Sequence, residues 1–158
     1  MPTIRLETPD QPDVRALIDA LDAYQKPLYP LSSFHGIDIA ALCRPEMSFF
    51  VARDEGGRAN GRAVGCAGIW VAEVDGVLSA EIKRMFVAPE ARGTGLGQRL
   101  LARLTAMARE RGAQRMVLET GNRQPEAQRL YERDGFALCG PFGTYAPDTH
   151  SLFMVKPL

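Results

Sequence analysis

Two long apolar segments separated by a two-residue turn signal constrain the fold of this chain most strongly. Residues 62–74 and 77–87 are rich in valine, isoleucine and aromatic side chains, and only Asp75-Gly76 stands between them. Because Asp-Gly favours the turn that closes tight hairpins, the two segments are expected to pair as antiparallel strands. Further apolar segments that are expected to be strands lie at residues 3–7, 48–53, 116–119, 136–139 and 151–155.

Four other segments are expected to be helical, and the longest of them joins two strands. It begins after a glycine-rich segment, ends near Gly112, and carries leucines at helical spacing on one face. The order strand, helix, strand predicts a crossover between parallel strands. The fold class is therefore α+β: a mixed, mainly antiparallel sheet flanked by helices, in a single domain over residues 1–158. The other predicted helices lie at residues 12–24, about 36–42, and 125–133.

The third long strand, 77–87, contains a change in the parity of its apolar residues. They occupy even positions at Leu78, Ala80 and Ile82, and odd positions at Met85 and Val87. Side chains along a strand alternate strictly between the two faces, so this change predicts a β-bulge near residues 83–84. A bulge leaves backbone groups without strand partners, and these groups can bind an extended ligand.

The segment from Arg92 to Gly97, Arg-Gly-Thr-Gly-Leu-Gly, lies between a predicted strand and a predicted helix. Free N–H groups and the positive end of the helix dipole favour phosphate at such a helix start. Glycine lets the backbone approach the anion closely. The spacing differs from the dinucleotide-binding fingerprint and from the Walker loop, which ends in Gly-Lys-Ser/Thr.

Composition and charge disfavour several classes of function. The 19 basic and 19 acidic residues balance, which argues against a nucleic-acid partner, although residues 83–133 are net basic and suit an anionic ligand. No apolar run is long enough for a membrane helix, and the N-terminal residues lack a signal-peptide pattern. The three widely spaced cysteines and two histidines indicate a cytoplasmic protein with no metal site.

Two stretches of the sequence resemble the GCN5-related N-acetyltransferase (GNAT) family. Residues 87–101 contain the R-x-x-G-x-G pattern of that family's pyrophosphate loop, and residues 127–136 contain its A-x-x-L-Y-x-x-x-G-F pattern. The resemblance implies the acyl-CoA N-acyltransferase fold, acetyl-CoA as co-substrate, and an amine of a small molecule or peptide as acceptor. It implies acetyl transfer by direct attack in a ternary complex, and it allows a homodimer.

The resemblance also implies roles for individual residues. The phenol of Tyr131, with an ordinary pKa of about 10, is expected to be the general acid that protonates the leaving thiolate. Gln124 or Asn122 is expected to hydrogen-bond the pantetheine. The main chain of Met85, Phe86 and Val87 is expected to run beside the pantetheine arm, and the pyrophosphate is expected to contact Arg92, Gly93, Thr94, Gly95, Leu96, Gly97 and Gln98.

An ammonium acceptor must lose a proton before it attacks a thioester, and a carboxylate commonly takes that proton. Glu81, just before the predicted bulge, is the favoured base, and Glu119 at the end of the next strand is the alternative. A different class of function is also open: a non-catalytic module that senses acyl-CoA. The sequence does not identify the acceptor, and the segments expected to select it are residues 29–36 and 142–150.

Overall fold

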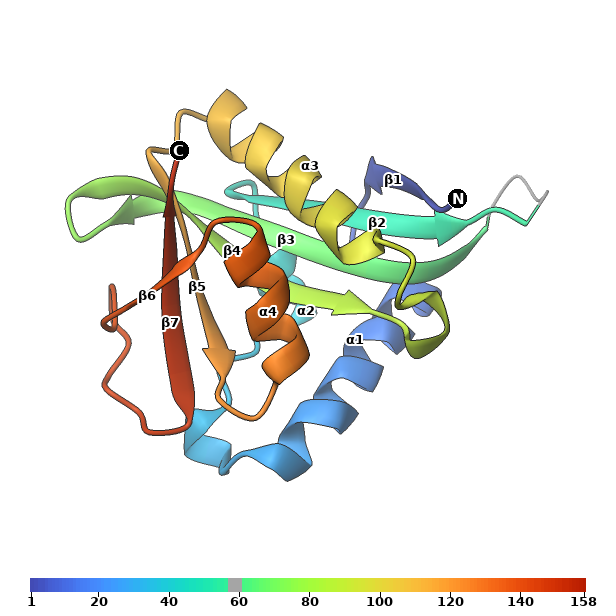
Figure 1. Cartoon of the computed structure of the whole chain (residues 1–158). Coiled ribbons are helices and arrows are strands. Elements are labelled where there is room, and N and C mark those ends of the chain that lie inside the picture. The colour runs from blue at the N-terminus through green and yellow to red at the C-terminus, as the bar shows by residue number, and fades with distance from the viewer. Residues whose placement is uncertain (57–60) are drawn as a thin grey trace.

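The computed structural model of the chain describes residues 1–56 and 61–158. Within them, one mixed sheet is flanked by helices (Figure 1), with the strand order β1-β2-β3-β4-β5-β7-β6. This arrangement confirms the predicted fold class. The strands are β1 (Thr3–Leu6), β2 (Met47–Asp54), β3 (Arg62–Val74), β4 (Val77–Val87), β5 (Arg115–Gly121), β6 (Ala137–Cys139) and β7 (Ser151–Pro157). The helices are α1 (Pro12–Gln25), α2 (Ile39–Leu42), α3 (Leu96–Glu110) and α4 (Pro125–Arg133), with short 3₁₀ turns at Lys26–Leu28, Leu31–Ser33 and Pro89–Ala91.

The helix predicted over about 36–42 is shorter than expected, because it begins at Ile39. Asp38 adopts an extended backbone conformation, and its carboxylate accepts a hydrogen bond from the N–H of Ala41 at 2.8 Å. This bond satisfies a free donor of the first turn and fixes the start of α2. Residues 36–38 are therefore a connection rather than part of the helix.

The hairpin between β3 and β4 forms as the Asp75-Gly76 signal predicts. Val74 pairs with Val77, and the two turn residues have φ angles of +51° and +78°. These positive angles are those of a type I′ turn, which matches the twist of the two strands. The hairpin supplies the centre of the sheet.

The predicted bulge is confirmed in β4. Cys66 of β3 pairs with Phe86, whereas Gly68, only two residues further, pairs with Lys83. β4 therefore contains an extra residue, and Arg84 within it has a φ of +53°. The Arg84 side chain is only 6% exposed. Its guanidinium forms an ion pair with Asp22 of α1 and donates to the carbonyl oxygen of Ile37 at 3.0 Å. These contacts hold the uncommon backbone conformation in place.

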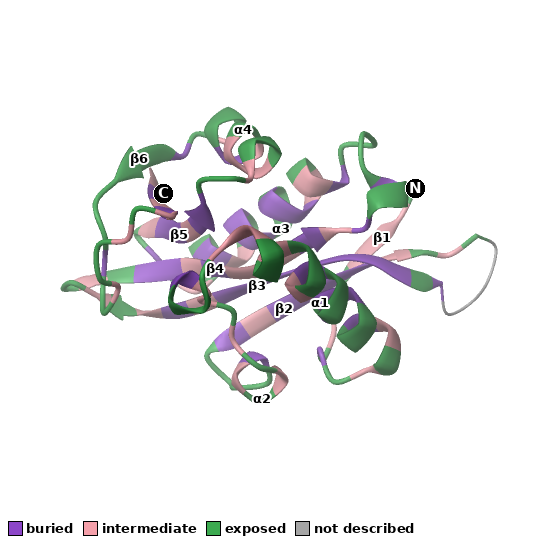
Figure 2. Cartoon of the chain, turned by 90° about the horizontal axis from the view of Figure 1, so that it is seen from below, coloured by how far each residue is buried: buried purple, intermediate pink, exposed green. Residues whose placement is uncertain are grey.

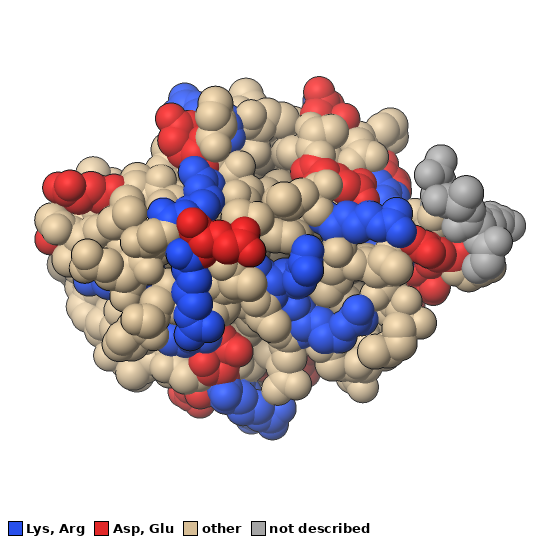
Figure 3. Space-filling model, turned by 90° about the horizontal axis from the view of Figure 1, so that it is seen from above, with Lys and Arg blue, Asp and Glu red and all other residues tan. Residues whose placement is uncertain are grey.

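The sheet is covered on both faces, so its strands alternate between two cores. Phe50 of β2 packs in the core that contains the buried leucines of α3, whereas Phe49 and Val51 pack against α1 and α2. Figure 2 shows the resulting buried strands with exposed outer helix faces. On the face that carries α3, acidic and basic side chains are interspersed (Figure 3).

The parallel pairing of β4 with β5 across the α3 crossover is short. It covers only Ser79 with Arg115, Ala80 with Met116, and Glu81 with Val117. Beyond these pairs β4 continues to Val87 and β5 to Gly121, so the two strands separate toward their carboxyl ends. The helix connection that follows β4 and the one that follows β5 both begin at this opening, which positions the candidate site.

Candidate functional site

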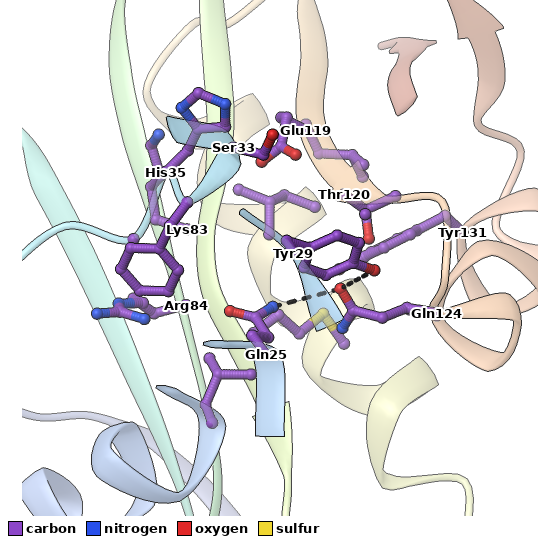
Figure 4. A pocket seen from close by; sticks show the side chains of 18 of the residues that line it. Gln25, Tyr29, Ser33, His35, Lys83, Arg84, Glu119, Thr120, Gln124 and Tyr131 are labelled. Atoms are coloured by element: carbon purple, nitrogen blue, oxygen red, sulfur yellow. Dashed lines mark hydrogen bonds between the residues drawn. The ribbon is translucent and has the colours of Figure 1, made fainter. Parts of the chain in front are cut away.

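Two adjoining cavities occupy the opening between β4 and β5. The larger, of about 680 Å³, is lined by the end of β4, the glycine-rich loop and the start of α4. The smaller, of about 100 Å³, is lined by residues 82–85 of β4, residues 118–121 of β5 and the connection from α1 to α2 (Figure 4). Met85, Gln124 and Tyr131 line both, so a ligand that crosses from one cavity to the other passes these side chains.

The glycine-rich loop presents its backbone to the larger cavity. Gly93 and Gly95 have φ angles of +74° and +79°, and a Cβ atom at either position would contact nothing within 4 Å. Gly95 precedes α3, whose first turn has no capping side chain, so its N–H groups are available to an anion. The open space beside these glycines fits the close approach of a pyrophosphate.

Most residues predicted to bind the cofactor line this cavity, and Thr94 does not. Its hydroxyl donates to the carbonyl oxygen of Ala91 at 2.7 Å, which holds the loop in shape. Asn122 lines neither cavity and donates to the carbonyl oxygen of Thr149 at 3.0 Å. The predicted residues that line the larger cavity are Met85, Phe86, Val87, Arg92, Gly93, Gly95, Leu96, Gly97, Gln98, Gln124 and Tyr131.

Helices α3 and α4 approach closely beside the loop. A Cβ atom at Gly97 would lie 3.0 Å from the side chain of Leu130, closer than ordinary van der Waals contact, so the lack of a side chain at Gly97 favours this close approach. The contact places Tyr131, the next residue of α4, at the junction of the two cavities. Tyr131 is 7% exposed, and its ring packs edge-on against that of Phe136, with the ring centroids 5.8 Å apart. Burial, with the nearby charge of Glu119, raises the pKa of the Tyr131 phenol, so it stays protonated at neutral pH.

Glu119 lines the smaller cavity, and Figure 4 shows its carboxylate among the labelled side chains there. Burial raises the pKa of this carboxyl, and the side chain of Ser151 and the nearby charges of His35 and Lys83 partly oppose that rise. A raised pKa makes a carboxylate a stronger base once it is ionised. Glu119 therefore combines access to the cavity with the electrostatics of a general base.

Glu81, the favoured base of the sequence analysis, does not line either cavity. Its carboxylate forms an ion pair with Lys83 at 2.7 Å and accepts a hydrogen bond from the hydroxyl of Tyr145 at 2.6 Å. These contacts occupy the carboxylate, and the role of Glu81 in catalysis stays a prediction. The geometry favours the alternative, Glu119.

A hydrogen-bond network between distant segments closes one side of the smaller cavity. The hydroxyl of Tyr29 donates to Gln124 at 3.2 Å, and Gln25 donates to the same oxygen at 3.5 Å (Figure 4). A Cβ atom at Gly121 would overlap the Tyr29 ring at 2.0 Å, so the ring lies directly on the end of β5. The sequence pointed to residues 29–36 and 142–150, but it did not single out Tyr29, because these contacts are non-local.

The chain is similar in sequence and structure to known acetyltransferases. The model of the acetyltransferase (GNAT) family matches residues 13–136, and the chain belongs to that family.

Within the described residues, no helix is long and apolar enough to cross a membrane. In the same part of the chain, no group of three or more histidine, cysteine or acidic side chains is placed to hold a metal ion.

Among relatives, the chain is 46% identical over 156 residues to an "IAA acetyltransferase" from Azospirillum brasilense, covering 99% of this chain and 97% of the relative. A Klebsiella pneumoniae protein assigned as an acyl-CoA N-acyltransferase has a similar structure, with a TM-score of 0.82 and 38% identity. That match covers 100% of this chain and 98% of the Klebsiella chain. A GNAT family acetyltransferase from Elizabethkingia anophelis with acetyl-CoA bound shares the fold, with a TM-score of 0.66, 18% identity, and coverage of 99% and 98%.

Proposed function

We propose that this acetyltransferase moves an acetyl group from acetyl-CoA to a primary amine by direct attack in a ternary complex. The observation that carries the proposal is the junction of the two cavities at Tyr131, with an anion-binding loop on one side and Glu119 on the other. None of the three cysteines lines either cavity, which disfavours an acetyl-cysteine intermediate. We further propose that residues 1–158 act as one domain in the cytoplasm. The homodimer that the family resemblance allows is tested by the mass of the protein in solution.

The binding residues have separate tasks in this proposal. Backbone N–H groups of residues 93–98 hold the pyrophosphate. The backbone of Met85 to Val87, which does not pair with β5, aligns the pantetheine in the opening between the strands. Gln124 turns its amide from Tyr29 and Gln25 toward the pantetheine. The thioester then lies beside Tyr131, within reach of an amine held in the smaller cavity.

The proton transfers follow from the two side chains at the junction. Glu119 accepts a proton from the bound ammonium group, and the free amine nitrogen forms a bond to the thioester carbon. The carbon–sulfur bond breaks, and Tyr131 donates its proton to the sulfur. The phenol recovers a proton from the acetylated nitrogen by way of solvent. General acid–base catalysis of this kind contributes about 10²–10⁴ in rate.

Two measurements test the proposal. Calorimetry should show binding of acetyl-CoA, and acetyl-CoA should raise the melting temperature far more than NAD or ATP, because it binds the folded state alone. Release of free thiol from acetyl-CoA should then depend on an added amine. Absence of binding at millimolar acetyl-CoA would overturn the assignment of the loop. Tight binding with no amine-dependent thiol release across a broad amine panel would favour the acyl-CoA sensor instead.

A further inference from the structure

The lining of the smaller cavity includes the basic residue of each of two ion pairs. Lys83 and Arg84 line it, whereas their partners, Glu81 and Asp22, do not. The Arg84 guanidinium is taken up by Asp22 and the carbonyl oxygen of Ile37, so Lys83 is the basic residue with capacity for a ligand. A cavity built to take a second ammonium group would not be expected to be lined by the basic rather than the acidic partners of these pairs.

Lys83 is held rigidly with one donor left over. Its Nζ lies 2.7 Å from the carboxylate of Glu81 and 2.7 Å from the hydroxyl oxygen of Tyr145. Tyr145 in turn donates to Glu81 at 2.6 Å, which closes a ring of three side chains. An ammonium group has three N–H donors, and these two are its acceptors in the part of the chain that the structure describes. One donor therefore remains for a ligand.

A second polar atom beside this lysine lacks a protein partner. The Nε2 atom of His35 is buried and makes no hydrogen bond within residues 1–56 and 61–158. The imidazole packs edge-on against the Tyr145 ring, with the two ring centroids 5.1 Å apart. A buried polar atom without a partner is costly, and a ligand that supplies the missing hydrogen bond removes that cost.

Glu119 is the one carboxylate among the described residues that line this cavity. In Figure 4 it lies opposite His35 and Lys83, with Ser33 between them. The cavity thus offers one anionic group and, across from it, two hydrogen-bonding groups of positive or neutral charge. Such a dipolar arrangement matches a small zwitterion better than a simple amine or a polyamine.

We propose that the acceptor is a free α-amino acid. Its ammonium group binds at Glu119, and its carboxylate accepts hydrogen bonds from Lys83 Nζ and His35 Nε2. Glu81 and Tyr145 act as positioning residues that hold Lys83 in place. The inference rests on the proposed amine acetylation and deepens it by naming the acceptor class. The N-terminal residue of a peptide has its carboxyl group in a peptide bond. A peptide therefore lacks the adjacent carboxylate and is a poorer acceptor.

The test compares amino acids with amines that lack only the carboxylate. The pairs are L-alanine with ethylamine, L-valine with isobutylamine, and L-phenylalanine with phenethylamine, each assayed by thiol release from acetyl-CoA. At least one amino acid should exceed its paired amine in kcat/KM by about tenfold to a hundredfold, the contribution of hydrogen bonds to a charged group. Lys83→Met should remove most of this preference by raising KM for the amino acid.

Lys156 provides a matched control. Its side chain is 15% exposed, and its ammonium pairs with Asp134 at 2.7 Å. The side chain of Lys83 is 16% exposed, and its ammonium pairs with Glu81 at the same distance. Lys156 lines neither cavity, so Lys156→Met should leave the preference unchanged. His35→Ala gives a second, independent reduction of the preference that does not depend on the folding of the lysine variant.

Two results would overturn the inference. The first is turnover of the simple amines at least as fast as that of the amino acids, which leaves the acetyltransferase function intact but rejects a carboxylate subsite. The second is an equal loss for amino acid and amine in Lys83→Met, which assigns Lys83 a structural role only. If acetyl-CoA binds but neither class is acetylated, the proposed amine acetylation fails along with the inference.

Discussion

Replacing Gly95 by alanine separates the binding role of the glycine-rich loop from its backbone strain. Gly95 has a φ of +79° and space for a Cβ atom, and it lines the larger cavity. Gly76, in the β3–β4 turn, has a φ of +78° and the same open surroundings, but it lies on neither cavity. The two substitutions therefore impose the same conformational strain and differ only in what faces the new methyl group.

The magnitude of the stability change follows from that shared backbone angle. An alanine in the left-handed region costs roughly 1–2 kcal/mol in unfolding free energy, and no steric overlap adds to it at either position. For a domain of this size, the loss corresponds to a fall in melting temperature of about 2–8 °C. Both variants should stay folded, because the free energy of unfolding of typical domains is roughly 5–15 kcal/mol.

The effect on coenzyme A should differ between the two variants. A methyl group at Gly95 holds the phosphate away from the N–H groups of the loop, and each lost hydrogen bond to a charged group costs about 1.5–3 kcal/mol. Calorimetry should show a Kd weakened about tenfold to a hundredfold for Gly95→Ala, and a wild-type Kd for Gly76→Ala. A wild-type Kd in folded Gly95→Ala, or equal losses in both variants, would refute the placement of the pyrophosphate at this loop.

Three further outcomes are expected from the proposed general base and general acid. Glu119→Gln should lower kcat/KM by about 10²–10⁴ while Glu81→Gln loses much less, and the reverse order would return the base to Glu81. Because the pKa of Glu119 is raised in the folded state, its ionisation destabilises the protein as pH rises above the ordinary glutamate value. The melting temperature of Glu119→Gln should therefore rise relative to that of wild type as the pH increases. A difference in melting temperature that stays constant from acid to neutral pH would contradict the burial of Glu119. Tyr131→Phe should lower kcat about tenfold to a thousandfold with an unchanged Kd for coenzyme A, and an unchanged kcat would exclude the phenol as the acid.

Local signals in the sequence predicted the elements that local chemistry determines. The Asp75-Gly76 turn, the bulge and the helix over residues 125–133 all appear where the sequence placed them. The strand order could not be read in the same way, because β7 lies between β5 and β6 although it follows both in the chain. That pairing depends on contacts between segments far apart in sequence.

In the candidate site, too, the sequence could predict the local features but not those that depend on contacts between distant segments. The glycine-rich loop and Tyr131 lie in contiguous motifs, so the sequence could single out these residues, which line the larger cavity. The choice between Glu81 and Glu119 depends on which carboxylate the loop around Tyr145 engages, and no periodicity encodes that contact. The structure shows Tyr145 bonded to Glu81, whereas Glu119 lies on the cavity. His35 and Lys83 were missed for the same reason.

The early separation of β4 from β5 gives this sheet two internal edges, each a row of backbone groups open to a foreign strand. Exposed edges of this kind invite pairing between molecules, and proteins commonly guard them with bulges and charged side chains. In β4 the bulge at Arg84, with Lys83 beside it, interrupts the regular ladder at that place. In the proposed function, the irregularity that leaves backbone groups to the ligand is therefore also one that makes this edge a poor template for a strand of another molecule.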